Sequence, residues 1–263
     1  MLNGKILHKL ARRAEYEWNL ARCLGFMRSF FRSLWSFVKS ESALNLYDGC
    51  ETVVIIGRGQ RFPSSKYISS MEFDLCIFLN NVSTELVQNI PSAKKYAQQC
   101  QPAPPFARFS REKIKKLNIS SLISNKTLDN YKLKRFKQLY AIKGCSIYHH
   151  PSDNEMIVAC SKYDVPAPTQ CGTVLKCMAS TPSVKKIHLY GIDFFHSDYL
   201  TSDYHDEFLG PRHVAKINPD AKGAILIGFV RELVQDHRPD IEVYVDPVLK
   251  PAFDGYERIK YYE

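Results

Sequence analysis

The feature that most restricts the fold of this 263-residue chain is a short run of β-branched residues, Thr-Val-Val-Ile-Ile at 52–56. β-Branched residues favour strands, and this run ends at once in Gly57-Arg58-Gly59. An apolar strand that ends in G-x-G is typical of the first strand and turn of a nucleotide-binding α/β domain, where glycines let backbone amides approach a phosphate or a ribose. No third glycine follows at the dinucleotide spacing and no P-loop lysine motif is present, so the motif alone leaves the nucleotide open.

Further apolar runs alternate between strand and helix patterns. Predicted strands are residues 73–79, 155–160, 187–190 and 241–245, and predicted helices are residues 171–179 and 224–233. Residues 88–135 are polar and rich in lysine, so we predict an irregular or helical insertion there. The alternation predicts an α/β domain with a mostly parallel sheet.

The predicted strand 187–190 ends in Gly191-Ile192-Asp193. The carboxyl ends of the strands of an open α/β sheet border the crevice where ligands bind. We therefore expect Gly191 to permit a close approach, and Asp193 either to orient a ribose or neighbouring backbone or to cap the following loop. Of the two rings that follow, Phe194 is expected to return to the core and Phe195 to face the site.

Residues 1–45 differ from the rest of the chain, because basic side chains alternate with an aromatic stripe at helical spacing. This pattern predicts basic amphipathic helices, followed by one α/β domain over residues 46–263. The apolar stripe fits two positions equally well: an anionic membrane interface, or the surface of the domain.

The formal net charge of +9 predicts an anionic partner, and nucleic acid, a membrane surface and a phosphorylated substrate all qualify. Eight cysteines without a CxxC pair indicate free thiols in a reducing cytoplasm. No signal peptide and no apolar run of membrane-spanning length is visible, so we expect neither secretion nor a transmembrane anchor.

In their order, these motifs resemble the bacterial sialyltransferases of glycosyltransferase family 42. In that family a first strand ends in G-N-G, a second strand ends in asparagine, a T-S-G motif opens a helix, and a later strand ends in G-I-D-F-Y. The corresponding elements here are Gly57–Gly59, Asn80, Gln170–Gly172 and Gly191–Phe195. The step from Gly172 to Gly191 is nineteen residues, as in the family.

The resemblance implies a Rossmann-like single nucleotide-binding domain, a GT-A-like variant, that acts as an inverting glycosyltransferase. It implies transfer of an acidic sugar, sialic acid or Kdo-like, from a CMP-sugar to a glycan or lipid-linked glycan acceptor, as in lipopolysaccharide or capsule biosynthesis. His213 corresponds to the catalytic base, and Tyr199, Tyr204 and Arg212 are candidates for stabilising the leaving phosphate. The implied nucleotide-binding residues are Gly57, Arg58, Gly59, Asn80, Cys171, Gly172, Asp193 and Phe195.

No D-x-D motif occurs, in agreement with a metal-independent family, so no metal and no cofactor are expected. The implied location is the cytoplasm, peripheral on the inner face of the membrane. The sequence shows no RNP, helix-turn-helix or zinc-finger pattern, so nucleic acid is not the expected partner. A homo-oligomer remains compatible with the sequence.

Three positions depart from the family pattern: Arg58, Cys171 and Phe195 stand where the family has asparagine, serine and tyrosine. These departures affect the identity of the donor sugar more than the identity of the nucleotide. They also keep an alternative open, in which the chain is a non-catalytic or nucleic-acid-binding basic α/β protein.

Overall fold

The computed structural model describes residues 41–57, 59, 61–79, 90–100, 111–124, 145–150, 170–194 and 219–263. The chain divides into Met1–Lys39 and a compact unit, Ser40–Glu263, and every described residue lies in the second unit. That unit includes Ala43, Leu46 and Tyr47, which are buried in its core. The α/β domain therefore begins before residue 46, where the sequence placed its start.

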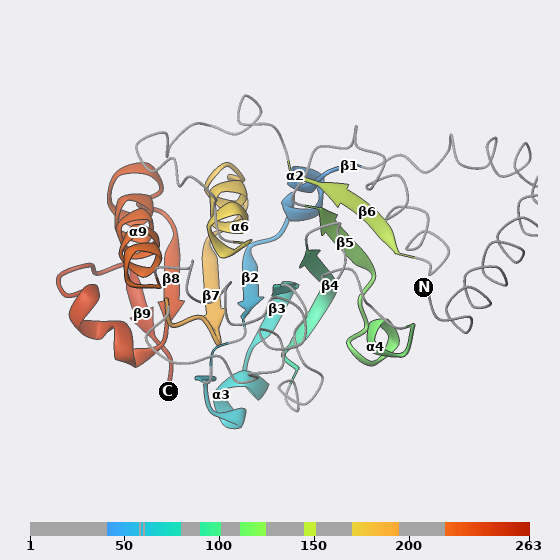
Figure 1. The fold of residues 1–263 in the computed structure, drawn as a ribbon, viewed down its shortest axis with the longest axis horizontal. Helices are drawn as coiled ribbons and strands as arrows, with labels where there is room; N and C mark the ends of the chain where they lie inside the picture. The colour runs from blue at the N-terminus through green and yellow to red at the C-terminus, as the bar shows by residue number, and fades with distance from the viewer. Residues whose placement is uncertain are drawn as a thin grey trace, which may run out of the picture. The chain divides into compact units, whose positions relative to one another are not determined.

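The described residues form one nine-stranded sheet in which every neighbouring pair of strands is parallel (Figure 1). The strands are β1 (Glu41–Ser42), β2 (Thr52–Ile56), β3 (Glu72–Leu79), β4 (Ser92–Cys100), β5 (Ser121–Ser124), β6 (Ser146–His149), β7 (Lys186–Tyr190), β8 (Glu242–Val245) and β9 (Ile259–Tyr261). Their order in the sheet is β1-β6-β5-β4-β3-β2-β7-β8-β9. The predicted α/β class with a parallel sheet is confirmed.

The strand order reverses direction between β2 and β7. From β2 the chain builds outward through β3 and β4 on one side, and then returns to build β7, β8 and β9 on the other side. The segment β4-β3-β2-β7-β8-β9 has the 3-2-1-4-5-6 order of doubly wound, Rossmann-like sheets. Ligands of such sheets bind outside the carboxyl ends of the two strands at the reversal, here β2 and β7.

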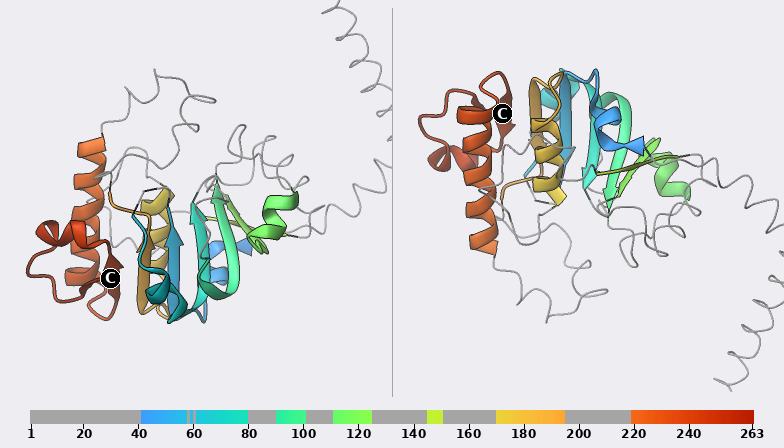
Figure 2. Two further views of the ribbon diagram at one scale, coloured as in Figure 1. Left: turned by 90° about the horizontal axis from the view of Figure 1, so that it is seen from below. Right: turned by 90° about the horizontal axis from the view of Figure 1, so that it is seen from above.

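Helices pack on both faces of the sheet. They are α2 (Ala43–Tyr47), α3 (Ser65–Ser69), α4 (Arg111–Lys116), α6 (Gln170–Ala179) and α9 (Pro219–Glu232). Residues of α2, α6 and α9 share one buried cluster, and residues of α3 and α4 belong to a second cluster on the other face. Figure 2 shows α6 and α9 beside each other at the β7–β9 side of the sheet.

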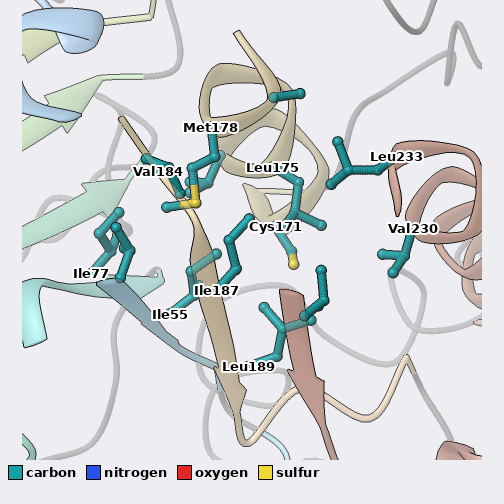
Figure 3. Close-up of a cluster of buried hydrophobic side chains, with 14 of the residues drawn as sticks. Ile55, Ile77, Cys171, Leu175, Met178, Val184, Ile187, Leu189, Val230 and Leu233 are labelled. Atoms are coloured by element: carbon teal, nitrogen blue, oxygen red, sulfur yellow. The ribbon is translucent and has the colours of Figure 1, made fainter. Parts of the chain in front are cut away.

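The central strand β2 supplies both cores. Val53 and Ile55 point to the cluster with α2, α6 and α9, whereas Val54 and Ile56 point to the opposite cluster. Figure 3 shows Ile55 of β2, Ile187 of β7 and Leu175 of α6 among the side chains of the first cluster. Burial on both faces explains why β2 reads as a continuous apolar run rather than as an alternating one.

Arg238 ties the end of α9 to the end of α6. A π-helical turn, Leu233–His237, continues α9, and it closes when the Arg238 N–H donates to Leu233 O at 2.7 Å. The Arg238 guanidinium then donates to carbonyl oxygens that follow or end α6, including those of Ala179 at 3.1 Å and Val184 at 2.9 Å. The Ala179 carbonyl is a group that the helix end leaves unsatisfied, and the Val184 carbonyl lies in the segment that leads into β7, so Arg238 holds both.

Most of the predicted elements are present with bounds close to those expected. β2, β3, β7 and β8 match the predicted strands and α6 matches the first predicted helix, whereas α9 covers the second predicted helix but begins earlier, at Pro219. The predicted strand at 155–160 lies outside the described residues. The prediction of an irregular or helical insertion at 88–135 is wrong for β4 and β5, which are strands of the sheet, whereas α4 in the same segment is a helix. β4 was not predicted as a strand because its carboxyl half is polar. Gln98 and Gln99 lie there, and both are fully buried in the structure.

Within the described part of the chain, no helix is both long enough and apolar enough to span a membrane.

Candidate functional site

Two motifs that are far apart in the sequence meet at the reversal between β2 and β7. The Gly57 N–H donates to Tyr190 O at 2.8 Å, and the Gly59 N–H donates to Gly191 O at 2.7 Å. The Gly191 N–H in turn donates to Arg61 O at 2.9 Å. Pairing between the two chain segments therefore continues past the ends of β2 and β7. We call this region, formed by Gly57, Gly59, Gly191 and Asp193, the switch-point edge.

The glycines are required by the closeness of the two backbones. A Cβ at Gly57 would lie 2.4 Å from Gly191 O and 2.5 Å from Ile192 Cγ1. A Cβ at Gly59 would lie 2.8 Å from Gly191 O. Gly191 has φ +63°, a left-handed conformation that favours glycine, and a Cβ there would lie 2.7 Å from the Phe62 ring. Packing between the two strand ends is thus a sufficient reason for all three glycines.

This geometry changes what the G-x-G turn can offer a ligand. The sequence led us to expect that its glycine amides would approach a phosphate or a ribose. Instead, the Gly57 N–H donates to Tyr190 O at the end of β7, and the Gly59 N–H donates to Gly191 O directly after it. A ligand can border the two glycines, but it cannot take these hydrogen bonds without breaking the contact with β7.

The backbone after β7 holds Asp193 between two residues with positive φ. Gly191 has φ +63° and Phe194 has φ +50°, which is uncommon for a bulky side chain. Phe194 is buried and its ring meets Phe253 edge-on, with the centroids 6.3 Å apart. The prediction that Phe194 returns to the core is confirmed. Strained residues of this kind concentrate at functional sites, which makes the end of β7 a candidate site.

Two further buried polar side chains, Asp246 and Tyr262, follow β8 and β9. Asp193, Asp246 and Tyr262 are all buried. The Tyr262 hydroxyl donates to Asp246 Oδ2 at 3.4 Å, and Asp246 Oδ1 accepts the Val248 N–H at 2.7 Å. Burial, with the negative charges of Asp246 and Asp193, raises the pKa of Tyr262 well above its usual value. The hydroxyl therefore stays protonated and remains a donor.

The helix α6 begins at the same edge of the sheet. It leads into β7 and runs opposite to it, and Gln99 Nε2 at the end of β4 donates to Gln170 O at 3.3 Å. Cys171 is buried in the core cluster between α6 and its neighbours (Figure 3). Burial raises the pKa of its thiol to about 12, so the thiol is protonated. The Cys171 side chain, proposed from the sequence to contact a nucleotide, packs in the core instead.

Five residues predicted for the site are described, and three of them come together. Gly57, Gly59 and Asp193 meet at the switch-point edge, with Asp193 Oδ1 3.5 Å from the position of a Cβ at Gly59. Cys171 and Gly172 lie in the first turn of α6, where both are buried. The other predicted residues lie outside the described part of the chain: Arg58, Asn80, Phe195, Tyr199, Tyr204, Arg212 and His213.

The sequence reasoning missed Asp246 and Tyr262. Asp246 could have been found from the sequence, because it is a carboxylate directly after a predicted strand. Asp193 was found in the same way, since it comes shortly after the predicted strand 187–190. Tyr262 had none, since β9 is only three residues long and its position depends on the strand order. Among the described residues, no group of three or more His, Cys, Asp or Glu side chains is arranged to hold a metal ion.

Comparison of the chain with models of known protein families gives no match, and comparison with curated protein sequences gives none either.

Proposed function

We propose that the chain is a CMP-sugar-dependent, inverting, metal-independent glycosyltransferase that transfers an acidic sugar, sialic acid or Kdo-like, to a glycan or lipid-linked glycan. The observation that supports this most is the direct contact between Gly57–Gly59 and Gly191 at the strand reversal. These are two of the motifs on which the resemblance to glycosyltransferase family 42 rests. They lie at the carboxyl edge where a Rossmann-like sheet binds its nucleotide.

The reaction in this proposal is a single displacement. The acceptor hydroxyl attacks the anomeric carbon, a new carbon–oxygen bond forms, and the bond to the CMP phosphate breaks with its electron pair going to the phosphate. The proton of the acceptor hydroxyl passes to a general base, the role given to His213 by the resemblance. Tyr199, Tyr204 and Arg212 are proposed as donors to the departing phosphate.

The N-terminal residues fit a peripheral location for this enzyme at the inner membrane face. Their alternation of basic and aromatic side chains suits an anionic lipid surface, and a lipid-linked acceptor would be met there. Membrane binding and transfer are separate properties, so each has its own test.

Calorimetric titration with CMP, UMP, GMP and AMP tests the nucleotide. We expect CMP to bind at least about ten-fold more tightly than the others, equivalent to about 1.4 kcal/mol. A panel of CMP-sugars, with CMP release as the readout, then identifies the donor. Equal or tighter binding of another nucleotide would contradict the CMP assignment, and CMP binding without turnover of any CMP-sugar would favour a non-catalytic protein.

A further inference from the structure

A nucleotide phosphate at the switch-point edge needs donors other than the glycine amides. The N–H groups of Gly57 and Gly59 already donate to backbone oxygens at the end of β7 and directly after it. Asp193 and Asp246, which follow β7 and β8, are buried carboxylates, so they add negative charge to the carboxyl ends of these strands. A phosphate is repelled there unless a positively charged side chain offsets this charge. The edge must therefore supply a cation if it is to bind a nucleotide.

Arg61 is a positively charged residue that the fold holds at this edge. Its carbonyl oxygen accepts the Gly191 N–H at 2.9 Å, and this bond places its backbone beside the residue that directly follows β7. It belongs to the same segment after β2 as Gly57 and Gly59. Its side chain is exposed, so a ligand outside the carboxyl ends of β2 and β7 can reach the guanidinium.

The chain is also anchored directly after Arg61. The Phe62 ring lies so close to Gly191 that a Cβ at Gly191 would come within 2.7 Å of it. Ser64 is the N-cap of α3, where its hydroxyl oxygen accepts the Tyr67 N–H at 3.2 Å. The Arg61 backbone is therefore fixed, and only its side chain has to be ordered when a ligand binds.

The Arg61 guanidinium forms no ion pair and no hydrogen bond with the rest of the described chain. Arg231 and Arg238, in contrast, donate to backbone carbonyl oxygens, and Arg258 lies 3.9 Å from a glutamate carboxylate. A guanidinium carries five N–H donors and no acceptor, so it can bind only acceptors, and anionic ones most strongly. The donors of Arg61 are thus available to an anion from outside the described chain.

We propose that Arg61 binds the phosphate of the nucleotide at the switch-point edge. The inference rests on the proposed function, in which CMP binds there. A guanidinium stays charged in proteins and forms two parallel hydrogen bonds to a phosphate. The phosphate is then held by a side chain, whereas in many nucleotide-binding loops glycine amides and a helix N-terminus hold it. Arg61 is a phosphate-binding residue in this proposal, and the acceptor hydroxyl does not depend on it.

Calorimetric titration of the full chain with CMP and with cytidine measures what the phosphate contributes. The wild-type protein is expected to bind CMP roughly 10- to 100-fold more tightly than cytidine, the effect of hydrogen bonds to a charged group. Arg61→Gln removes the charge and is expected to reduce this ratio to about 3-fold or less, through a loss of CMP affinity with cytidine affinity unchanged. Arg61→Lys keeps the charge without the paired donors, so its ratio should lie between these values.

Arg258→Gln is the matched control. Arg258 is also exposed and the variant removes the same charge, but this residue directly precedes β9 and so lies at the amino end of that strand. The variant should keep the wild-type ratio of CMP to cytidine affinity. Unfolding midpoints of all variants are measured alongside. Arg61→Gln should leave the midpoint unchanged, because an exposed side chain without bonds in the described chain contributes little to stability.

The outcomes separate this inference from the proposed function. CMP binding with an unchanged ratio in Arg61→Gln overturns the role of Arg61 alone, as does an equal loss in Arg258→Gln, which would reflect net charge only. A lowered midpoint in Arg61→Gln, with cytidine affinity reduced as much as CMP affinity, would overturn it in favour of a structural role. If CMP does not bind, the proposed function fails, and UMP, GMP and AMP are compared with their nucleosides. No phosphate-dependent affinity in any of these pairs, or an unchanged ratio in Arg61→Gln for the nucleotide that binds, then overturns this inference as well.

Discussion

Replacing His188 should remove part of the acid sensitivity of this fold. His188 lies in the middle of β7 with its side chain fully buried. Its ring stacks on Tyr244, with centroids 4.1 Å apart, and meets the edge of Phe73 at 5.0 Å. Neither ring nitrogen has a hydrogen-bond partner in the described part of the chain. Burial, helped by the positive charge of Lys186, lowers the pKa of His188 to about 3.

The direction of the pH effect follows from the pH range in which the unfolded and the folded states each take up the proton. In the unfolded chain a histidine has a pKa near 6.5, so below that pH the unfolded state takes up a proton that the folded state refuses. The stability is therefore fully present above about pH 6.5 and is lost as the pH falls towards the folded pKa. Between pH 7 and about pH 4.5 this amounts to about two pKa units, or about 2 to 3 kcal/mol from His188.

The variant His188→Phe keeps a flat ring for the stack and removes the titration. Denaturant unfolding at pH 7 and at about pH 4.5 should show a loss of stability that is smaller in the variant than in the wild type by about 2 to 3 kcal/mol. At pH 7 the variant should be at least as stable, because two buried nitrogens without partners have been removed. His237→Gln, at a partly exposed position, is the control and should keep the wild-type pH dependence.

A second buried histidine, His150, should leave part of the acid sensitivity in place when His188 is replaced. Burial lowers the pKa of His150 to about 4, and its Nδ1 lies 3.0 Å from Cys177 Sγ. Acid sensitivity should therefore persist in His188→Phe, but at a reduced level. If the loss of stability between the two pH values were the same in His188→Phe as in the wild type, His188 would not be a buried, neutral group in the folded protein.

Three further predictions follow from the sequence and the structure. His213→Ala should lower CMP-sugar turnover by about 100- to 10,000-fold with CMP affinity nearly unchanged, whereas His205→Ala should stay active; the opposite result would show that the base is wrongly assigned. Arg238→Lys should lower the free energy of unfolding by about 2 kcal/mol, because a lysine cannot reach the several carbonyl oxygens at the end of α6 at once; an unchanged unfolding midpoint would contradict this. Deleting residues 1–39 should abolish sedimentation with anionic liposomes and spare folding, and retained sedimentation would exclude this segment as the membrane contact. Deleting residues 1–45 should also destabilise the domain, since Ala43 is buried in its core.

Elements buried on both faces could be predicted from the sequence, and polar or very short ones could not. β2 is a run of β-branched, mostly apolar residues, and β7 contributes Ile187, Leu189 and Tyr190, so both strands can be identified without knowledge of their neighbours. β4 is a full-length strand, but it places Gln98 and Gln99 in the interior, and such residues resemble those of a loop in the sequence. β9 owes its existence to pairing with β8, which no local pattern encodes.

The candidate site was also predictable from the sequence only in part. Glycines and a carboxylate at strand ends were visible in the sequence as Gly57, Gly59 and Asp193, because residues at strand ends recur in ligand sites of α/β sheets. Their mutual contact was not visible, since it depends on β7 lying directly beside β2. The hydrogen bond between Tyr262 and Asp246 was not visible either, since it depends on β9 lying beside β8.

That contact also bears on how a nucleotide phosphate could be held. The amides of Gly57 and Gly59 are bound to Tyr190 O and Gly191 O, so the turn after β2 acts as a rigid border and not as a phosphate cradle. If CMP binds at the switch-point edge, its phosphate must take its donors from other groups. Side chains such as Tyr199, Tyr204 and Arg212, the donors proposed for the leaving phosphate, can be directed at the charge that develops as the bond breaks. The glycine turn would then fix the position of the nucleoside, and the chemistry at the phosphate would depend on separate residues.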